Sequence, residues 1–252
     1  MRTCRFRRGG RELYGVIEGQ EVRALTAEPW AGGLPEGPAY ALPDVTLLAP
    51  VAPSKVVCVG RNYRAHAKEL GNEVPKEPLL FIKPSTSILG PGGTIRHPEQ
   101  SKEVHHEAEL GAVIGRTLTR AATAVEAREA IFGWTCVNDV TARDIQRAEA
   151  HFTRAKGFDT FCPVGPFVET ALDPLDVVVT CRVNGEQRQR GSTKDMVFDP
   201  YLLVAFISQT MTLLPGDLVS TGTPEGVGPL RRGDVVEVEV SGIGVLKNAV
   251  AG

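Results

Sequence analysis

The chain has 252 residues, which suits one large domain or one domain with a small appendage. Its formal net charge of −2 favours neither nucleic acid nor an anionic membrane as a partner. No run approaches about 18 apolar residues, so no membrane span is predicted, and the basic N-terminus lacks the apolar region of a signal peptide. The five cysteines form no C-x-x-C pair, and we interpret them as reduced thiols of a cytoplasmic protein.

The first 50 residues are interpreted as a small β-rich N-terminal piece followed by a linker. Residues 2–24 predict short strands joined by Gly turns. Residues 25–50 are rich in Pro, Gly and Ala, and they predict the linker. A second, compact domain is predicted over residues 51–252.

Short strands and short helices follow one another irregularly in the second domain. Strands are predicted at 54–60, 78–84, 104–114, 134–140, 216–222, 234–240 and 244–250, with a hairpin turn at Asn184-Gly185. Helices are predicted at 61–70, at 124–132 after a capping box of Thr123 and Glu126 and before a break at Gly133, at 142–150, and from Asp199-Pro200 to Met211. This order lacks a βαβ alternation and favours a β-rich α+β fold with few helices.

The stretch "EVHHEAELGAVIG" places His105, Glu107 and Glu109 on one face of the predicted strand 104–114. Two carboxylates that close together need water or a cation between them. Glu237 and Glu239 have the same spacing on a strand whose acids we expect in water, so spacing alone leaves both alternatives open.

Asp139 is a candidate third carboxylate, because it follows a strand-like run and precedes a helix. Three carboxylates without cysteine form an oxygen-only ligand set, which favours Mg²⁺ or Mn²⁺ over Zn²⁺ or copper.

His66 and Glu69 share a face of the helix predicted at 61–70, where a carboxylate would orient the imidazole as a general base. The alternative is a solvated surface helix with a chance ion pair. Cys58 is interpreted as a core residue and not as a nucleophile beside His66. His105 is expected to face the site, and His106 is expected to pack in the core.

Six motifs in order resemble the fumarylacetoacetate hydrolase family, in its short branch of acylpyruvate hydrolases and oxaloacetate decarboxylases. They are "VCVGRNYRAHAKEL", "PLLFIKPSTSI", "HHEAELGAVIG", "GWTCVNDVTARDIQ", "AKGFDTFCPVGPF" and "LLPGDLVSTGTPEGVGP". The resemblance implies a mixed-sheet β-roll core with short flanking helices, a homodimer, and a catalytic role for residues 51–252.

The resemblance also implies roles for single residues. Glu107, Glu109 and Asp139 would hold Mg²⁺ or Mn²⁺. The implied catalytic residues are His66, Glu69 and Lys156. The implied substrate-binding residues are Lys83, Arg143, Gln146 and Thr223.

The implied substrate is a small 2-oxo or 2-hydroxy-2-enoic carboxylic acid. The first interpretation is C–C bond cleavage of acylpyruvates by hydrolysis, or decarboxylation of oxaloacetate-type acids, through an enolate that the cation stabilises. One alternative is an isomerase of 2-hydroxyhepta-2,4-diene-1,7-dioate type in aromatic catabolism, and another is a catalytically silent binding protein.

Two departures from the long hydrolases argue against fumarylacetoacetate itself as the substrate. Val59 stands where those enzymes carry a fourth acidic ligand, and the N-terminal piece is much shorter than theirs. Arg61, Lys83 and Arg143 could instead meet a second carboxylate of a small acid.

Overall fold

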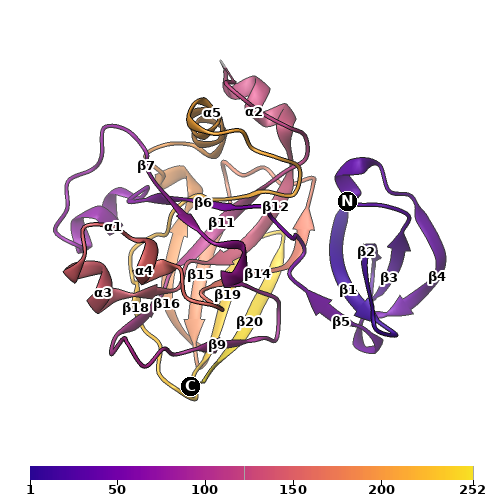
Figure 1. Cartoon of the computed structure of the whole chain (residues 1–252), viewed down its shortest axis with the longest axis horizontal. Helices are drawn as coiled ribbons and strands as arrows, with labels where there is room; N and C mark the ends of the chain where they lie inside the picture. The colour runs from indigo at the N-terminus through magenta and orange to yellow at the C-terminus, as the bar shows by residue number, and fades with distance from the viewer. Residues whose placement is uncertain (122, 252) are drawn as a thin grey trace.

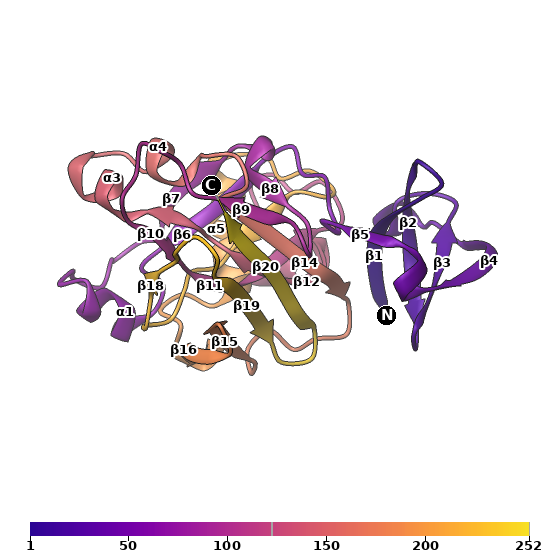
Figure 2. The ribbon, with the colours of Figure 1, turned by 90° about the horizontal axis from the view of Figure 1, so that it is seen from below.

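The N-terminal residues form a separate small lobe in the computed structural model, which describes residues 1–121 and 123–251. Figures 1 and 2 show this indigo lobe beside the larger body of the chain. An antiparallel meander builds it from β1 (Arg2–Arg8), β2 (Arg11–Glu18), β3 (Glu21–Leu25) and β4 (Pro35–Ala41).

The prediction of a linker over residues 25–50 is wrong. Strand β4 pairs with β3, and β5 (Thr46–Leu48) pairs with β1. Pro35 and Pro38 lie in β4 at the outer edge of the sheet, where a missing N–H breaks no ladder. The Pro and Gly content that suggested a linker instead belongs, in part, to a strand at the edge of the sheet.

One large mixed sheet runs from this lobe into the body, because β1 pairs with β14 (Cys162–Glu169). The path continues β14-β12-β11-β17-β6-β7, and β8 pairs with β14. Most neighbours are antiparallel, but β17 with β6 and β8 with β14 are parallel. These strands are β6 (Val56–Gly60), β7 (Leu79–Lys83), β8 (Ile88–Leu89), β11 (Ala108–Ile114), β12 (Ile131–Asn138) and β17 (Leu218–Ser220).

Two smaller sheets complete the body. The five-stranded sheet contains β9 (Thr94–Arg96), β15 (Val178–Val183), β16 (Glu186–Ser192), β19 (Val235–Val240) and β20 (Gly244–Ala251). The three-stranded sheet contains β10 (Val104–His106), β13 (Thr141–Ala142) and β18 (Gly228–Pro229). The prediction of a β-rich α+β fold with mixed sheets is confirmed.

The helices are short and stand around the sheets (Figure 1). They are α1 (Arg64–Glu69), α2 (Ala124–Ala130), α3 (Arg143–Ala148), α4 (Thr153–Lys156) and α5 (Pro200–Thr210), with 3₁₀ turns at Pro29–Ala31, Leu42–Asp44, Ser85–Ser87 and Thr193–Asp195. The predicted capping box of Thr123 and Glu126 begins α2. The helix ends at Ala130 and not at Gly133, which lies inside β12 where a Cβ would meet the Glu169 carbonyl oxygen at 2.8 Å.

Strand β11 is buried on both faces, and this burial places the later site inside the core. All seven of its residues are buried, because it lies between β12 and β17 in the large sheet and packs against β15 and β19. A polar side chain on this strand is therefore cut off from bulk water and needs partners.

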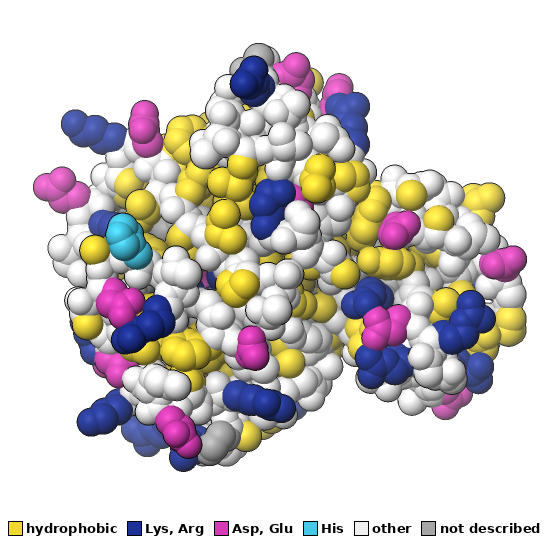
Figure 3. Space-filling view, viewed as in Figure 1, with side chains coloured by type: hydrophobic (Ala, Val, Ile, Leu, Met, Phe, Trp, Pro, Cys, Tyr) yellow, Lys and Arg dark blue, Asp and Glu magenta, His cyan; other side chains and the backbone are white. Residues whose placement is uncertain are grey.

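The five cysteines are free and buried. Burial raises the pKa of the Cys58 thiol well above its ordinary value, which agrees with its interpretation as a core residue. Among residues 1–121 and 123–251, no helix is long and apolar enough to cross a membrane. Acidic and basic side chains are interspersed over the face seen in Figure 3, as the small net charge suggests.

Asp199→Ala should lower the free energy of unfolding by about 1 kcal/mol. Asp199 caps α5 by accepting hydrogen bonds from the backbone N–H groups of Tyr201 and Leu202. Urea unfolding followed by circular dichroism measures the loss. Asp159→Ala, at an exposed position, is the control and should change stability by less than about 0.5 kcal/mol. Equal effects of the two variants would contradict the capping role.

Candidate active site

Three buried carboxylates meet where β11 begins and β12 ends. The strands pair with Ala108 opposite Asn138 and Glu109 opposite Val137. Glu107 precedes β11 and Asp139 follows β12, and the Asp139 N–H donates to the Glu107 carbonyl oxygen at 2.8 Å. One carboxylate oxygen from each of Glu107, Glu109 and Asp139 lies within 4.8 Å of the others. The structure therefore brings together the three residues predicted as metal ligands.

The predicted strand 104–114 is broken at Glu107, with β10 and β11 in different sheets. The break changes the position of His105, whose Nε2 lies 3.0 Å from Glu103 and which does not line the cavity. The prediction that His105 faces the site is therefore wrong. His106 is buried and donates from Nδ1 to Gln189 Oε1 at 2.9 Å, so it packs as predicted.

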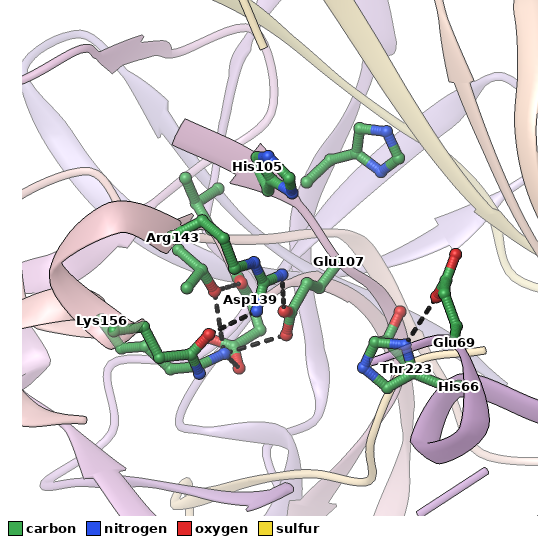
Figure 4. A network of polar contacts seen from close by, with 12 residues as sticks. His66, Glu69, His105, Glu107, Asp139, Arg143, Lys156 and Thr223 are labelled. Atoms are coloured by element: carbon green, nitrogen blue, oxygen red, sulfur yellow. Dashed lines mark hydrogen bonds and ion pairs between the residues drawn. The ribbon is translucent and has the colours of Figure 1, made fainter. Parts of the chain in front are cut away.

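Buried cations neutralise two of the three acids (Figure 4). Lys156 Nζ donates to Glu107 Oε2 at 2.9 Å, to Asp139 Oδ2 at 2.5 Å and to Thr141 Oγ1 at 2.8 Å. The Arg143 guanidinium pairs with Glu107 and also bonds Gln146. Burial alone would raise the pKa of Glu107, but Lys156 and Arg143 hold it well below its usual value.

Lys83 does not lie where the resemblance implied. Its side chain is fully buried, and Nζ donates to Asp139 Oδ1 at 2.6 Å and to the Val140 carbonyl oxygen at 3.0 Å. It is not among the residues that line the cavity. Lys83 therefore supports Asp139 from behind, and the prediction that it lines the substrate cavity is wrong.

Glu109 differs from the other two acids, because it has no cationic partner among the described residues. Its Oε2 accepts from Ser220 Oγ at 2.5 Å and from the Gly222 N–H at 2.8 Å. Burial, together with the nearby Asp139 and Glu107 carboxylates, raises the pKa of Glu109 to about 8. An oxygen-only set with one uncompensated buried carboxylate suits a hard divalent cation.

A cavity of about 350 Å³ opens onto the carboxylates. The predicted site residues that line it are His66, Glu107, Glu109, Asp139, Arg143, Gln146, Lys156 and Thr223. His66 and Glu69 come from α1, and the His66 Nδ1 lies 3.0 Å from Glu69 Oε2 (Figure 4). The second oxygen of Glu69 accepts from the Gly226 N–H at 2.9 Å.

This hydrogen bond sets the tautomer of the His66 ring. A neutral imidazole that donates from Nδ1 to Glu69 keeps a lone pair on Nε2. The pair is thus an oriented base on the wall of the cavity, and the alternative of a solvated surface ion pair fails because His66 is 3% exposed.

Sequence reasoning missed several supporting residues. Gln189 is fully buried; it accepts from the Ala108 N–H at 3.0 Å and donates to Thr223 Oγ1 and to the Pro224 carbonyl oxygen, each at 2.8 Å. Nothing in "EQRQRG" marks one glutamine of a hairpin as a core residue. The glycine-rich motif "STGTPEG" could have indicated Gly222, because glycine is typical of positions with positive φ and close packing. Its φ is 99°, and a Cβ there would lie 2.6 Å from the Asn62 Cβ.

A cavity of this size with convergent carboxylates, a buried lysine and an oriented histidine is typical of an enzyme site for a small acid. The chain belongs to the fumarylacetoacetate hydrolase family: the family described as "Fumarylacetoacetate (FAA) hydrolase C-terminal" matches residues 55–251. A second family, "Rv2993c-like, N-terminal", matches residues 1–50. Members of the hydrolase family depend on a divalent metal, and the acid cluster fits that dependence.

Several named enzymes are similar to this protein over most of the chain. The mitochondrial oxaloacetate tautomerase FAHD1 of Arabidopsis thaliana is 46% identical over 75% of this chain and 87% of its own. The 5-carboxymethyl-2-hydroxymuconate delta-isomerase of Mycobacterium smegmatis is 44% identical with a TM-score of 0.94, covering 100% of this chain and 99% of its own. The 2-hydroxyhepta-2,4-diene-1,7-dioate isomerase of Mycobacterium marinum is 43% identical with a TM-score of 0.93, covering 100% and 98%.

Glu109→Gln should weaken Mn²⁺ binding by about 100-fold or more, since even partners of metal ligands change affinity by about 10- to 100-fold. Isothermal titration calorimetry on chelator-treated protein measures the affinity. Glu237→Gln is the matched control, because Glu237 also alternates with apolar residues on a strand but pairs with Lys247 at 3.0 Å. The control should bind Mn²⁺ as the wild type does, and unchanged binding in Glu109→Gln would contradict the site.

Mn²⁺ affinity should rise with pH and level off near pH 8, the pKa to which burial raises Glu109. Below that pH the metal-free protein holds a proton on Glu109, and the cation must displace it. Affinity should therefore fall by about tenfold for each pH unit below the plateau. Calorimetry in buffers of different ionisation enthalpy should show up to one proton released. A pH-independent affinity between pH 6 and about 8 would contradict this assignment.

Proposed function

We propose that the protein catalyses proton transfer at the carbon next to the carbonyl of a 2-oxo acid, as a tautomerase or isomerase of oxaloacetate-type acids. One observation carries the proposal: His66, oriented by Glu69, lines the same small cavity as the acid cluster and Lys156. The three similar proteins named above, a tautomerase and two isomerases, support it.

The three carboxylates would hold Mg²⁺ or Mn²⁺, which would polarise the 2-oxo-carboxylate head as a Lewis acid. Lys156 and Arg143 are fixed beside the acids by their ion pairs, so their positive charge is already in place when substrate enters. Preorganised charge of this kind stabilises negative charge as it develops on the substrate oxygen.

His66 carries out the proton step. With Nδ1 donating to Glu69, the free Nε2 takes the proton from the carbon next to the carbonyl, and the electron pair of that C–H bond forms the enol double bond. The imidazolium that results is stabilised by the Glu69 carboxylate. Returning the proton to the substrate oxygen gives the enol. In a 2-oxo acid with a C=C bond one carbon further along, loss of the same proton gives a dienolate, and returning the proton to its far carbon gives the isomer.

C–C bond cleavage is the second candidate, and it uses the same residues. For hydrolysis of an acylpyruvate, His66 would activate a water that attacks the distant carbonyl, whereas decarboxylation of oxaloacetate would need no water. Membership of a family named after a hydrolase supports this candidate. Pyruvate release distinguishes it from proton transfer. A small 2-oxo acid as the partner and a homodimeric assembly stay predictions.

His66→Gln should lower kcat/KM for enol–keto conversion of oxaloacetate by about 100-fold or more, the usual contribution of a general base. The assay follows the ultraviolet absorbance of the enol with Mn²⁺ present, and pyruvate is measured in parallel. His151→Gln is the control, because His151 is exposed and does not line the cavity. No conversion by the wild type, or full activity of His66→Gln, would refute the proposal. Pyruvate formation without tautomerisation would replace it with the second candidate.

A further inference from the structure

Among the described residues, four cationic side chains other than histidine line the cavity, and three of them already pair with carboxylates. Lys156 and Arg143 bind the acid cluster. Arg147, at the mouth, makes a two-point contact with Glu103. Arg61 makes no ion pair or side-chain hydrogen bond with any described residue, although it lines the cavity and is only partly exposed. Among the described residues it is therefore the cavity cation without a carboxylate partner in the protein.

The backbone of Arg61 is held in an unfavourable conformation. Its φ is 61°, in the left-handed region that residues other than glycine, asparagine and aspartate seldom adopt. The neighbours impose this turn: Gly60 ends β6 in register with Leu79, and Asn62 is fully buried. The Asn62 amide donates to the carbonyl oxygens of Phe198 and Thr221 and accepts from the Phe198 N–H.

Glycine would fit this position without strain, yet the chain carries a long cationic side chain there. Strain of this kind clusters at ligand-binding sites, where the surrounding structure maintains it. The strained backbone therefore suggests that the guanidinium of Arg61 binds a ligand.

Two aromatic rings line the same cavity as Arg61. Phe81 and Phe152 line the cavity together with Arg61, and their rings pack edge to face with centroids 5.4 Å apart. Lys156 Nζ lies 4.9 Å from the centroid of the Phe81 ring, so this ring contacts the lysine of the acid cluster and also lines the cavity with Arg61. Beside an apolar wall, a guanidinium–carboxylate pair is less screened than in water and can be bidentate.

We propose that Arg61 binds the second carboxylate of a dicarboxylic 2-oxo acid, and so selects dicarboxylates over acids with a neutral tail. The inference rests on the proposed function, because it takes the acid cluster as the site of the 2-oxo-carboxylate head. Arg61 then fixes the distal end of the substrate and leaves the carbon between the two ends for His66.

The test compares oxaloacetate with its 4-ethyl monoester, which keeps the head and neutralises the distal carboxylate. Arg61→Gly should lower kcat/KM for oxaloacetate by about 10- to 100-fold, mostly through KM, as expected for loss of a charged hydrogen bond. The kcat/KM of Arg61→Gly for the monoester should differ from that of the wild type by less than about threefold. Arg61→Lys should recover part of the loss for oxaloacetate, because it keeps the charge without the bidentate geometry.

Glycine suits the left-handed φ, so Arg61→Gly should fold, and thermal unfolding checks this. Arg64→Ala is the matched control, since Arg64 is exposed on the adjacent helix and does not line the cavity. An equal loss for oxaloacetate and the monoester in Arg61→Gly would assign the residue to backbone positioning and overturn the proposal.

A binding measurement separates this inference from the proposed activity. Calorimetry with Mn²⁺ present compares malate with 2-hydroxybutanoate, which has a methyl group where malate has its distal carboxylate. The wild type should bind malate more tightly by about tenfold or more, and Arg61→Gly should remove that preference. If the wild type converts neither oxaloacetate nor the monoester, the proposed function fails, yet this comparison still decides the role of Arg61. No preference for malate in the wild type would overturn it.

Discussion

The pairing of β11 with β12 is the constraint on which the site depends. It places three carboxylates in a part of the core where the strand is buried on both faces. Buried charges need partners, and the surrounding residues provide them in different ways. Lys83, Lys156 and Arg143 neutralise Asp139 and Glu107, whereas Ser220 and Gly222 only donate hydrogen bonds to Glu109. The imbalance at Glu109 is the physical reason to expect a cation there.

The same constraint divides the charged residues of the cavity into two groups. Lys83 does not line the cavity, and it hydrogen-bonds Asp139, one of the predicted metal ligands. Lys156 lines the cavity and bonds both Asp139 and Glu107. Distance from the acids along the chain does not separate these roles. Position on the cavity wall does, since both lysines are buried but only Lys156 lines the cavity where substrate would bind.

The sequence predicted the site better than it predicted the local structure. The alternation of Glu107 and Glu109, the strand end at Asp139 and the i, i+3 pair of His66 and Glu69 depend on short-range geometry. The structure brings the three acids and His66 to one cavity, with Glu69 bonded to His66. The family resemblance supplied their expected roles, which the geometry alone does not test. The position of Lys83 and the partners of Gln189 depend on how distant strands pack, which no local pattern encodes. The strands within residues 25–50 were missed because edge strands tolerate proline and glycine.

The loop that follows β17 contacts both chemical halves of the site. Ser220, the last residue of β17, and Gly222 of the loop donate hydrogen bonds to Glu109, and Gly226 of the loop donates one to Glu69. Thr223 lies between them and is fixed by Gln189. We therefore expect a displacement of this loop at Gly222 to change the position of Glu69 on α1, the helix that also carries His66. Coupling free energy between two sites is reciprocal. If binding of a cation at the three carboxylates favours the ordered position of the His66 ring, then ordering of that ring must raise the affinity for the cation by the same factor.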